Sequence, residues 1–218
     1  MNYLKKFENL ITLENPILRG SALSNCHTNG LHSFVLHKYP NDCLIRIFVA
    51  TSDHDLWKNH CGMMSKTWDN LSIGIHPHHV DIAIYPIFGI LWNVEFQKKR
   101  NRGSNPGDCH LKSFKWSSEI LTGLGGFSLV GDEVLTLTNH RTMTQQRKYP
   151  MKSNELHTVY ITKGQPAAWI IQESPASKGY DATTYSNVDL TSWSSDGLYL
   201  KPSEEDIVEI FKQIEIEL

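Results

Sequence analysis

Three histidines and an aspartate lie within six residues of the chain, at His76, His78, His79 and Asp81. Imidazole nitrogens and carboxylate oxygens are side-chain atoms that bind divalent metals. In an extended chain the side chains alternate between two faces, so His76 and His78 share one face while His79 and Asp81 share the other. Either pair could supply two ligands. The apolar run 82–89 follows directly, which favours an ordered strand over a solvated loop.

A further ligand is predicted at His157, because it lies in a strand-like segment, 155–161, that follows a bend at 149–154. Two histidines and a carboxylate on neighbouring strands, with coordination positions left open, are typical of non-haem Fe(II) centres. Zn, Mn and Ni accept the same kinds of ligand. The residues therefore predict a divalent metal site and leave the metal open.

Composition narrows the class of protein. The chain has 218 residues, enough to bury a full core, and we expect a single domain, 1–218. The 21 Lys and Arg balance 23 Asp and Glu, so no basic surface indicates nucleic acid or an anionic membrane. The sequence contains no run of about 18 apolar residues, so no membrane span is predicted. The four cysteines (Cys26, Cys43, Cys61 and Cys109) form no CxxC pair, and no segment resembles a signal peptide, which favours a cytoplasmic protein.

Aromatic and β-branched residues at this density predict a mostly β fold. The barrel core is expected over about 30–173, followed by an irregular flap at 174–200. A short helix is predicted at 2–12 from its apolar spacing, and another at 203–216, with Ser203 as its N-cap. The turn at 163–166 predicts a hairpin between the strand of His157 and the strand 167–173. The other strands are expected at 31–37, 43–50, 82–89, 90–96, 114–116 and 134–138.

The pattern of short strands with an HxHHxD cluster and a distant histidine resembles the cupin superfamily. Two cupin motifs are matched, the first by His76, His78, Asp81 and Gly89, the second by Pro150 and His157. The acid is Asp instead of the usual Glu and stands one residue early, and the segment 152–154 replaces the Gly of the second motif. The resemblance implies a double-stranded β-helix, a jelly-roll barrel, with a metal inside it. The implied ligands are His76, His78, Asp81 and His157.

A second resemblance is to the 2-oxoglutarate oxygenases, which share the barrel and use an HxD…H triad. Here His79, Asp81 and His157 would take those places, which makes His79 the alternative ligand. Those enzymes commonly hold the cosubstrate with a basic residue after the last histidine, but the last arginine of this chain is Arg147. The cupin pairing is therefore preferred.

The leading hypothesis is a metal-dependent enzyme, an Fe(II) oxygenase (dioxygenase type) that acts on a small polar molecule. The alternatives are a non-redox isomerase, lyase or hydrolase with Zn, Mn or Ni, and a module that binds a small ligand without chemistry. A homodimer follows from the resemblance alone. Four residues on predicted strands are candidates for lining the substrate site: His32, Arg46, Tyr160 and Trp169.

Overall fold

The fold was analysed in a computed structural model that describes residues 3–59, 74–99, 108–116, 126–145, 147–175, 183–186, 192–194, 197–216 and 218. Cys61 and much of the predicted flap lie outside these residues. The described helices include α1 (Tyr3–Phe7), the 3-10 helix η1 (Glu8–Leu10), α2 (Pro16–Gly20) and α4 (Glu204–Lys212). The strands are β1 (Leu31–Lys38), β2 (Leu44–Ala50), β3 (Ile82–Phe88), β4 (Leu91–Lys98), β5 (Asp108–Trp116), β6 (Gly126–Met143), β7 (Tyr149–Met151), β8 (Leu156–Tyr160), β9 (Ala167–Glu173), β10 (Thr183–Ser186) and β11 (Ser192–Ser194).

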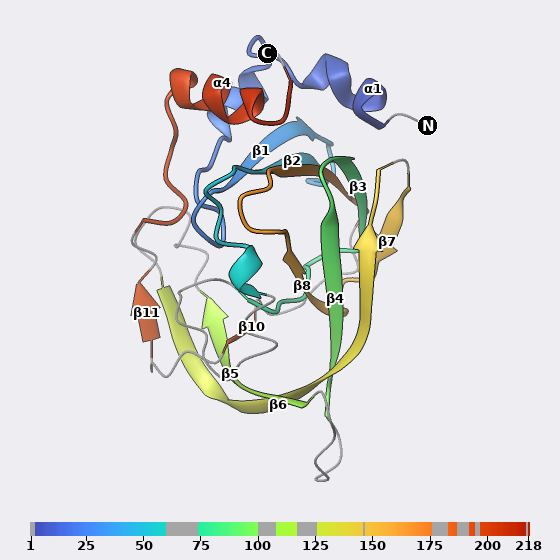
Figure 1. Ribbon diagram of the computed structural model, residues 1–218, viewed down its shortest axis with the longest axis vertical. Helices are drawn as coiled ribbons and strands as arrows, with labels where there is room; N and C mark the ends of the chain where they lie inside the picture. The colour runs from blue at the N-terminus through green and yellow to red at the C-terminus, as the bar shows by residue number, and fades with distance from the viewer. Residues whose placement is uncertain are drawn as a thin grey trace.

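Two curled antiparallel sheets form a barrel-like fold (Figure 1). One sheet has the strand order β1-β2-β9-β3-β7. The other has the order β10-β5-β6-β4-β8, with β11 paired to β6. The predicted mostly β barrel is thereby confirmed. Among the described residues, no helix is both long and apolar enough to cross a membrane.

The five-stranded sheet has a hydrophobic cluster on each face, and alternate side chains of β2 belong to the two clusters. Ile45, Ile47 and Val49 belong to a core cluster that also contains residues of α4. Phe48 and Ala50 point the other way, into a second cluster between the two sheets. Because side chains alternate along a strand, Arg46 shares the inward face with Phe48. A cationic side chain is therefore directed toward the interior of the barrel.

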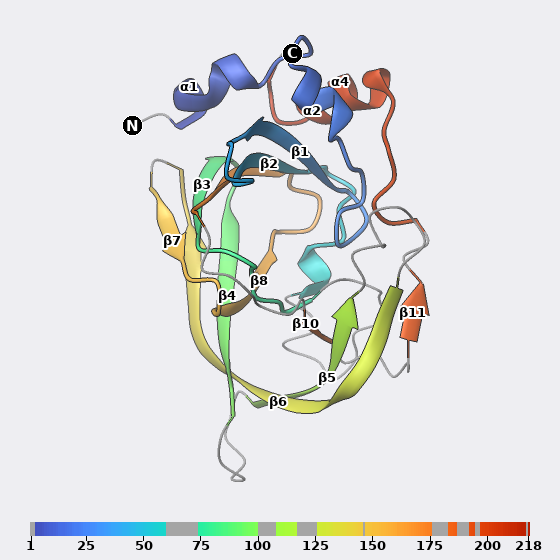
Figure 2. The same cartoon turned by 180° about the vertical axis from the view of Figure 1, so that it is seen from behind.

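The helices cover the outer face of this sheet, where α1, α2 and α4 lie together beside β1 and β2 (Figures 1 and 2). Helix α4 begins at the predicted cap: the Ser203 side chain accepts from the Asp206 backbone N–H, and the Asp206 side chain accepts in return from the Ser203 N–H. Ile207, Ile210 and Phe211 of α4 are buried. The Phe211 ring packs on Phe34 of β1 with ring centroids 4.9 Å apart. The apolar spacing that predicted this helix thus faces the sheet.

Two residues connect the opposite edges of the six-stranded sheet. Ile75 forms an isolated bridge to Tyr185 on β10, the first strand in the order, and His76 forms one to His157 on β8, the last. The His76 bridge contains both reciprocal backbone hydrogen bonds, of 3.0 and 3.1 Å. One of the predicted metal ligands therefore sits where this sheet closes on itself.

Several local expectations need correction. β8 and β9 do not form a hairpin: β8 pairs with β4, whereas β9 pairs with β2 and β3 in the other sheet. The turn before β9 therefore carries the chain from one sheet to the other. β6 runs from Gly126 to Met143, far beyond the predicted 134–138. The stretch expected to be an irregular flap contains two short strands, β10 and β11.

Candidate metal centre

Three of the predicted ligands come together inside the barrel. His76, His78 and His157 each offer an imidazole nitrogen, and these three atoms lie within 4.8 Å of one another. His157 is 3% exposed on β8, and the other two side chains are partly buried on the segment that precedes β3. Catalytic zinc sites commonly use three protein ligands and leave a position open. The group has the right atoms and number for such a centre.

Backbone contacts position the two histidines of the cluster segment. The bridge to β8 fixes the backbone of His76, and its Nδ1 lies 3.1 Å from the Gly74 carbonyl oxygen. A carbonyl oxygen only accepts, so Nδ1 of His76 carries the proton and Nε2 keeps its lone pair. The backbone N–H of His78 donates to the Ser153 carbonyl at 3.1 Å. Both ligands are thus tied to the residues around β8.

Asn93 on β4 sets the tautomer of His157. Its Oδ1 lies 2.6 Å from His157 Nδ1, while its Nδ2 donates to Glu95 Oε1 at 2.9 Å. Because the carboxylate only accepts, the amide orientation is fixed and His157 must donate from Nδ1. Arg141 Nη2 lies 2.6 Å from the same Glu95 oxygen and holds that carboxylate in place. The lone pair of His157 Nε2 is therefore directed toward the other two imidazoles, as metal ligation requires.

His78 and His157 approach each other more closely than two unprotonated nitrogens can. Their Nε2 atoms lie 2.8 Å apart, so without a metal His78 must donate its Nε2 proton to His157. Around a tetrahedral ion with ligand distances near 2.0–2.1 Å, the ligand nitrogens would be about 3.4 Å apart. Small side-chain movements would therefore convert the hydrogen-bonded pair into a ligand pair. The donor set fits a divalent ion that accepts imidazole.

Burial favours the neutral imidazoles. It is the main reason why the pKa of His157 is held well below its usual value and why the pKa of His78 is lowered to about 3. The pKa of His76 is lowered for the same reason. Neighbouring imidazoles lower the pKa of His157 and His78 further, because two adjacent positive charges repel. Near neutral pH the three imidazoles are therefore largely uncharged, and few protons have to leave before a metal can bind.

The remaining two residues of the cluster are placed differently. The Asp81 carboxylate accepts from Lys152 Nζ at 2.7 Å and from the Ser153 backbone N–H at 2.9 Å, and these hydrogen bonds lower its pKa. His79 is exposed and does not belong to the three-histidine group. Of the two pairs that alternation allowed, the structure brings His76 and His78 to His157.

Gly89, matched above to the first motif, forms the turn between β3 and β4. Its φ of +71° lies in the left-handed region that favours glycine. A Cβ at this position would approach the Pro166 carbonyl oxygen to 2.6 Å. The close packing of this turn against the start of β9 thus requires a glycine.

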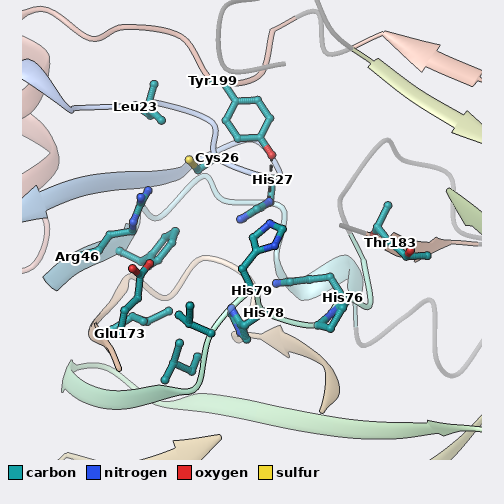
Figure 3. A pocket seen from close by; sticks show the side chains of 16 residues that line it. Leu23, Cys26, His27, Arg46, His76, His78, His79, Glu173, Thr183 and Tyr199 are labelled. Atoms are coloured by element: carbon teal, nitrogen blue, oxygen red, sulfur yellow. Dashed lines mark hydrogen bonds between the residues drawn. The ribbon is translucent and has the colours of Figure 1, made fainter. Parts of the chain in front are cut away.

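A cavity of about 370 Å³ lies against the histidines (Figure 3). Such a volume is at the small end of the range for small-molecule sites. Of the four predicted substrate residues, only Arg46 lines this cavity. Its other lining residues are Leu23, Cys26, His27, Phe48, His76, Pro77, His78, His79, Val80, Ile82, Ile171, Glu173, Thr183, Thr184 and Tyr199.

The other three predicted substrate residues lie elsewhere. His32 is buried with its Nδ1 3.0 Å from Ser24 Oγ, on the helix-covered side of β1 that also carries Phe34. Trp169 stacks on Phe48 within the core between the sheets, with ring centroids 5.5 Å apart. Tyr160 projects from the opposite face of β8 to His157, and its hydroxyl lies 2.8 Å from His140 Nε2. Their strands were predicted, but not which face of each strand meets the cavity.

Sequence reasoning missed two residues beside the histidines. The His27 ring stacks on His76 at 5.3 Å, and His27 Nδ1 lies 3.1 Å from the Tyr199 hydroxyl (Figure 3). Both residues have positive φ values, +70° and +55°, which non-glycine residues rarely adopt. Their segments lie 172 positions apart in sequence. Isolated polar residues in turn-rich stretches give no sequence signal for such a meeting.

The comparisons with known proteins are sparse. No family model matches the sequence, and no curated protein matches it. Among solved structures, the chain is similar to a hydroquinone 1,2-dioxygenase, PnpCD, solved with Cd²⁺ and 4-hydroxybenzonitrile. The identity is 10% and the TM-score 0.34, over 67% of this chain, which spans 65% of the length of the other protein. That activity and those ligands belong to the other protein.

Proposed function

We propose that the chain is a metal-dependent, cupin-type enzyme whose divalent ion is held by His76, His78 and His157. The single observation that carries this proposal is the convergence of three imidazole nitrogens within 4.8 Å of one another, beside a cavity that His76 and His78 line. In the metal-free protein one N–H···N hydrogen bond of 2.8 Å joins His78 and His157. A divalent ion in place of that proton would have all three imidazole nitrogens as ligands.

A bound divalent ion would polarise a coordinated substrate group as a Lewis acid, and with Fe(II) it would also supply redox chemistry with dioxygen. The protein contributes the rest. Asn93 and the Gly74 carbonyl hold two imidazoles in the ligating tautomer. The apolar walls of the cavity, which include Phe48 and Ile171, would pack against the apolar part of a substrate.

For the reaction we propose an Fe(II) oxygenase acting on a small polar molecule, with the sequence resemblance as its support. The matched positions of His76, His78 and His157 all fall in the three-histidine group. A second candidate is a hydrolase, lyase or isomerase with zinc. One observation favours it: the group contains no carboxylate, and three histidines are an established ligand set of catalytic zinc.

Metal analysis joined to oxygen uptake tests this proposal. Protein loaded separately with Fe(II) and Zn(II) should hold about one ion per chain by elemental analysis. His157→Ala should lose most of that metal, because two ligands compete poorly with water. His140→Ala is the matched control, since His140 is exposed and bonds Tyr160 outside the group.

The reaction is decided with the same samples. Substrate-dependent oxygen consumption by the iron form alone supports the oxygenase. Turnover by the zinc form without oxygen consumption supports the second candidate. Equal metal content in wild-type protein, His157→Ala and His140→Ala would reject the metal site and both enzymes with it, leaving the small-ligand module.

A further inference from the structure

Arg46 is the cationic group of the cavity. It lies at the centre of β2, where its Cα partners are Val35 on β1 and Ile171 on β9. Its Nη1 donates to Ser33 Oγ at 2.9 Å, and its guanidinium lies 6.0 Å from the centre of the Phe48 ring. These contacts fix the direction of the side chain, which lines the cavity together with Cys26 and Glu173 (Figure 3).

The positive charge of Arg46 has no anionic partner within ion-pair distance among the described residues. Glu173 also lines the cavity, but its Oε2 accepts from the Leu44 backbone N–H at 3.0 Å. Burial raises the pKa of the Glu173 carboxyl even though Arg46 acts in the opposite direction. A guanidinium has five N–H donors, and among the described residues one of them donates to a side chain, that of Ser33. The cation thus keeps donors available to a ligand.

The rest of the lining restricts what that ligand can be. Leu23, Val80, Ile82 and Ile171 give the cavity an apolar body, while His76 and His78 of the three-histidine group lie at its wall. None of the three imidazoles carries a negative charge, so a divalent ion there would add to the positive potential of Arg46. An anionic molecule with an apolar body matches this lining. The planar fork of an arginine can donate to both oxygens of a planar carboxylate.

We propose that the cavity binds a small amphipathic carboxylate whose carboxylate is held by Arg46 while its other end reaches the metal centre. The second half of this statement rests on the proposed function, but the first does not. Arg46 can recognise a carboxylate whether or not a metal is bound. The experiment below therefore uses metal-free protein first.

Pairs of probes that differ only in charge test the assignment. Benzoate, phenylacetate and 3-methylbutanoate would each be titrated against their primary amides, with binding followed by protein NMR chemical shifts. In metal-free wild-type protein, at least one carboxylate should bind about 10- to 100-fold more tightly than its amide, the range for one charge-assisted contact. Arg46→Gln should remove that preference, and Arg46→Lys should retain part of it.

Arg19→Gln is the matched control, because the same change is made at an exposed arginine that pairs with Glu204 on the helix layer. It should leave the preference unchanged. The thermal midpoint and near-UV spectrum of Arg46→Gln must resemble those of Arg46→Lys, which separates lost recognition from lost folding. Equal binding of every acid and its amide by wild-type protein would overturn the proposal, and so would a preference that survives in Arg46→Gln.

Repeating the titrations with metal-loaded protein separates this inference from the proposed function. If metal does not bind but the carboxylate preference depends on Arg46, the recognition stands and the metal centre fails. If metal binds stoichiometrically but no carboxylate preference exists, the enzyme proposal stands and this inference fails.

Discussion

The Nε2 atoms of His78 and His157 lie 2.8 Å apart, although 79 positions separate the two residues in sequence. Asn93 forces His157 to present a lone pair in this contact, so a proton of His78 occupies the space between the two nitrogens in the metal-free protein. A divalent ion would replace that proton. The contact therefore links the fold, which brings β8 to the segment before β3, to the chemistry of the site.

Single substitutions in the histidine cluster should show which face of the segment supplies the metal ligands. His78→Ala is expected to lower bound metal strongly, because it removes one of three ligands. His79→Ala should retain metal, because His79 is exposed and outside the group. Elemental analysis after dialysis measures both. Metal loss in His79→Ala with retention in His78→Ala would favour the HxD arrangement instead.

Asp81→Asn extends this comparison. In the structure the Asp81 carboxylate accepts hydrogen bonds from Lys152 and Ser153. The Asp81→Asn variant should therefore bind metal at close to the wild-type level. Strong metal loss in Asp81→Asn would restore Asp81 as a ligand, as the motif resemblance implied.

Much of the fold could be predicted from apolar runs and caps. β1, β2 and β3 are mostly apolar runs between turn residues, and Ser203 with the acidic residues after it marks the start of α4. The pairing of β9 between β2 and β3 could not be predicted, because a tight turn after β8 suggests a hairpin. Strand neighbours of this kind are set by long-range packing of both faces of the sheet, which local sequence does not encode.

The site, too, contains residues that the sequence predicted and others that it did not. Spacing and motif resemblance predicted His76, His78 and His157, which the structure brings together. Strand alternation left open which pair of the cluster faces His157, because the segment 76–81 contains one isolated bridge, at His76, and bends instead of regular strand. Asn93 had one usable sequence signal: it stands between Trp92 and Val94 in the mostly apolar first half of β4, and the structure buries it fully. Such a residue needs a partner, here His157.

Asn93 is expected to act as a positioning residue for the metal. Asn93→Leu removes the acceptor of His157 Nδ1–H, so His157 can rotate or change tautomer. Losing an outer hydrogen bond to a ligand histidine typically weakens metal affinity by about 10- to 100-fold. Competition with a chromophoric chelator measures this affinity. Asn139→Leu is the control, since Asn139 bonds the other oxygen of Glu95 without touching His157. Equal affinities in the two variants would contradict the positioning role.

His32 should make folding stability depend on pH. Burial lowers the pKa of His32 from 6.5 to about 4, although Asp53 and Asp206 act in the opposite direction. Well above pH 6.5 the residue is neutral in both states and contributes no pH dependence. As the pH falls from 6.5 toward 4, the unfolded chain binds a proton that the folded chain does not, so stability is lost.

The size of this effect follows from the difference in pKa. Between pH 7 and pH 5, His32 should account for a loss of about 2 kcal/mol in the free energy of unfolding. Urea unfolding of wild-type protein and His32→Gln at both pH values gives the contribution by difference. Identical losses in the two proteins would show that His32 titrates normally in the folded state.

X-ray absorption spectroscopy of the metal-loaded wild-type protein tests the metal centre most directly, because it counts imidazole ligands through their characteristic outer-shell scattering. The structure predicts three imidazoles per ion, with ligand distances of about 2.0–2.1 Å for zinc, and oxygen ligands at the open positions. A first shell of oxygen alone, or a single imidazole, would contradict the three-histidine centre.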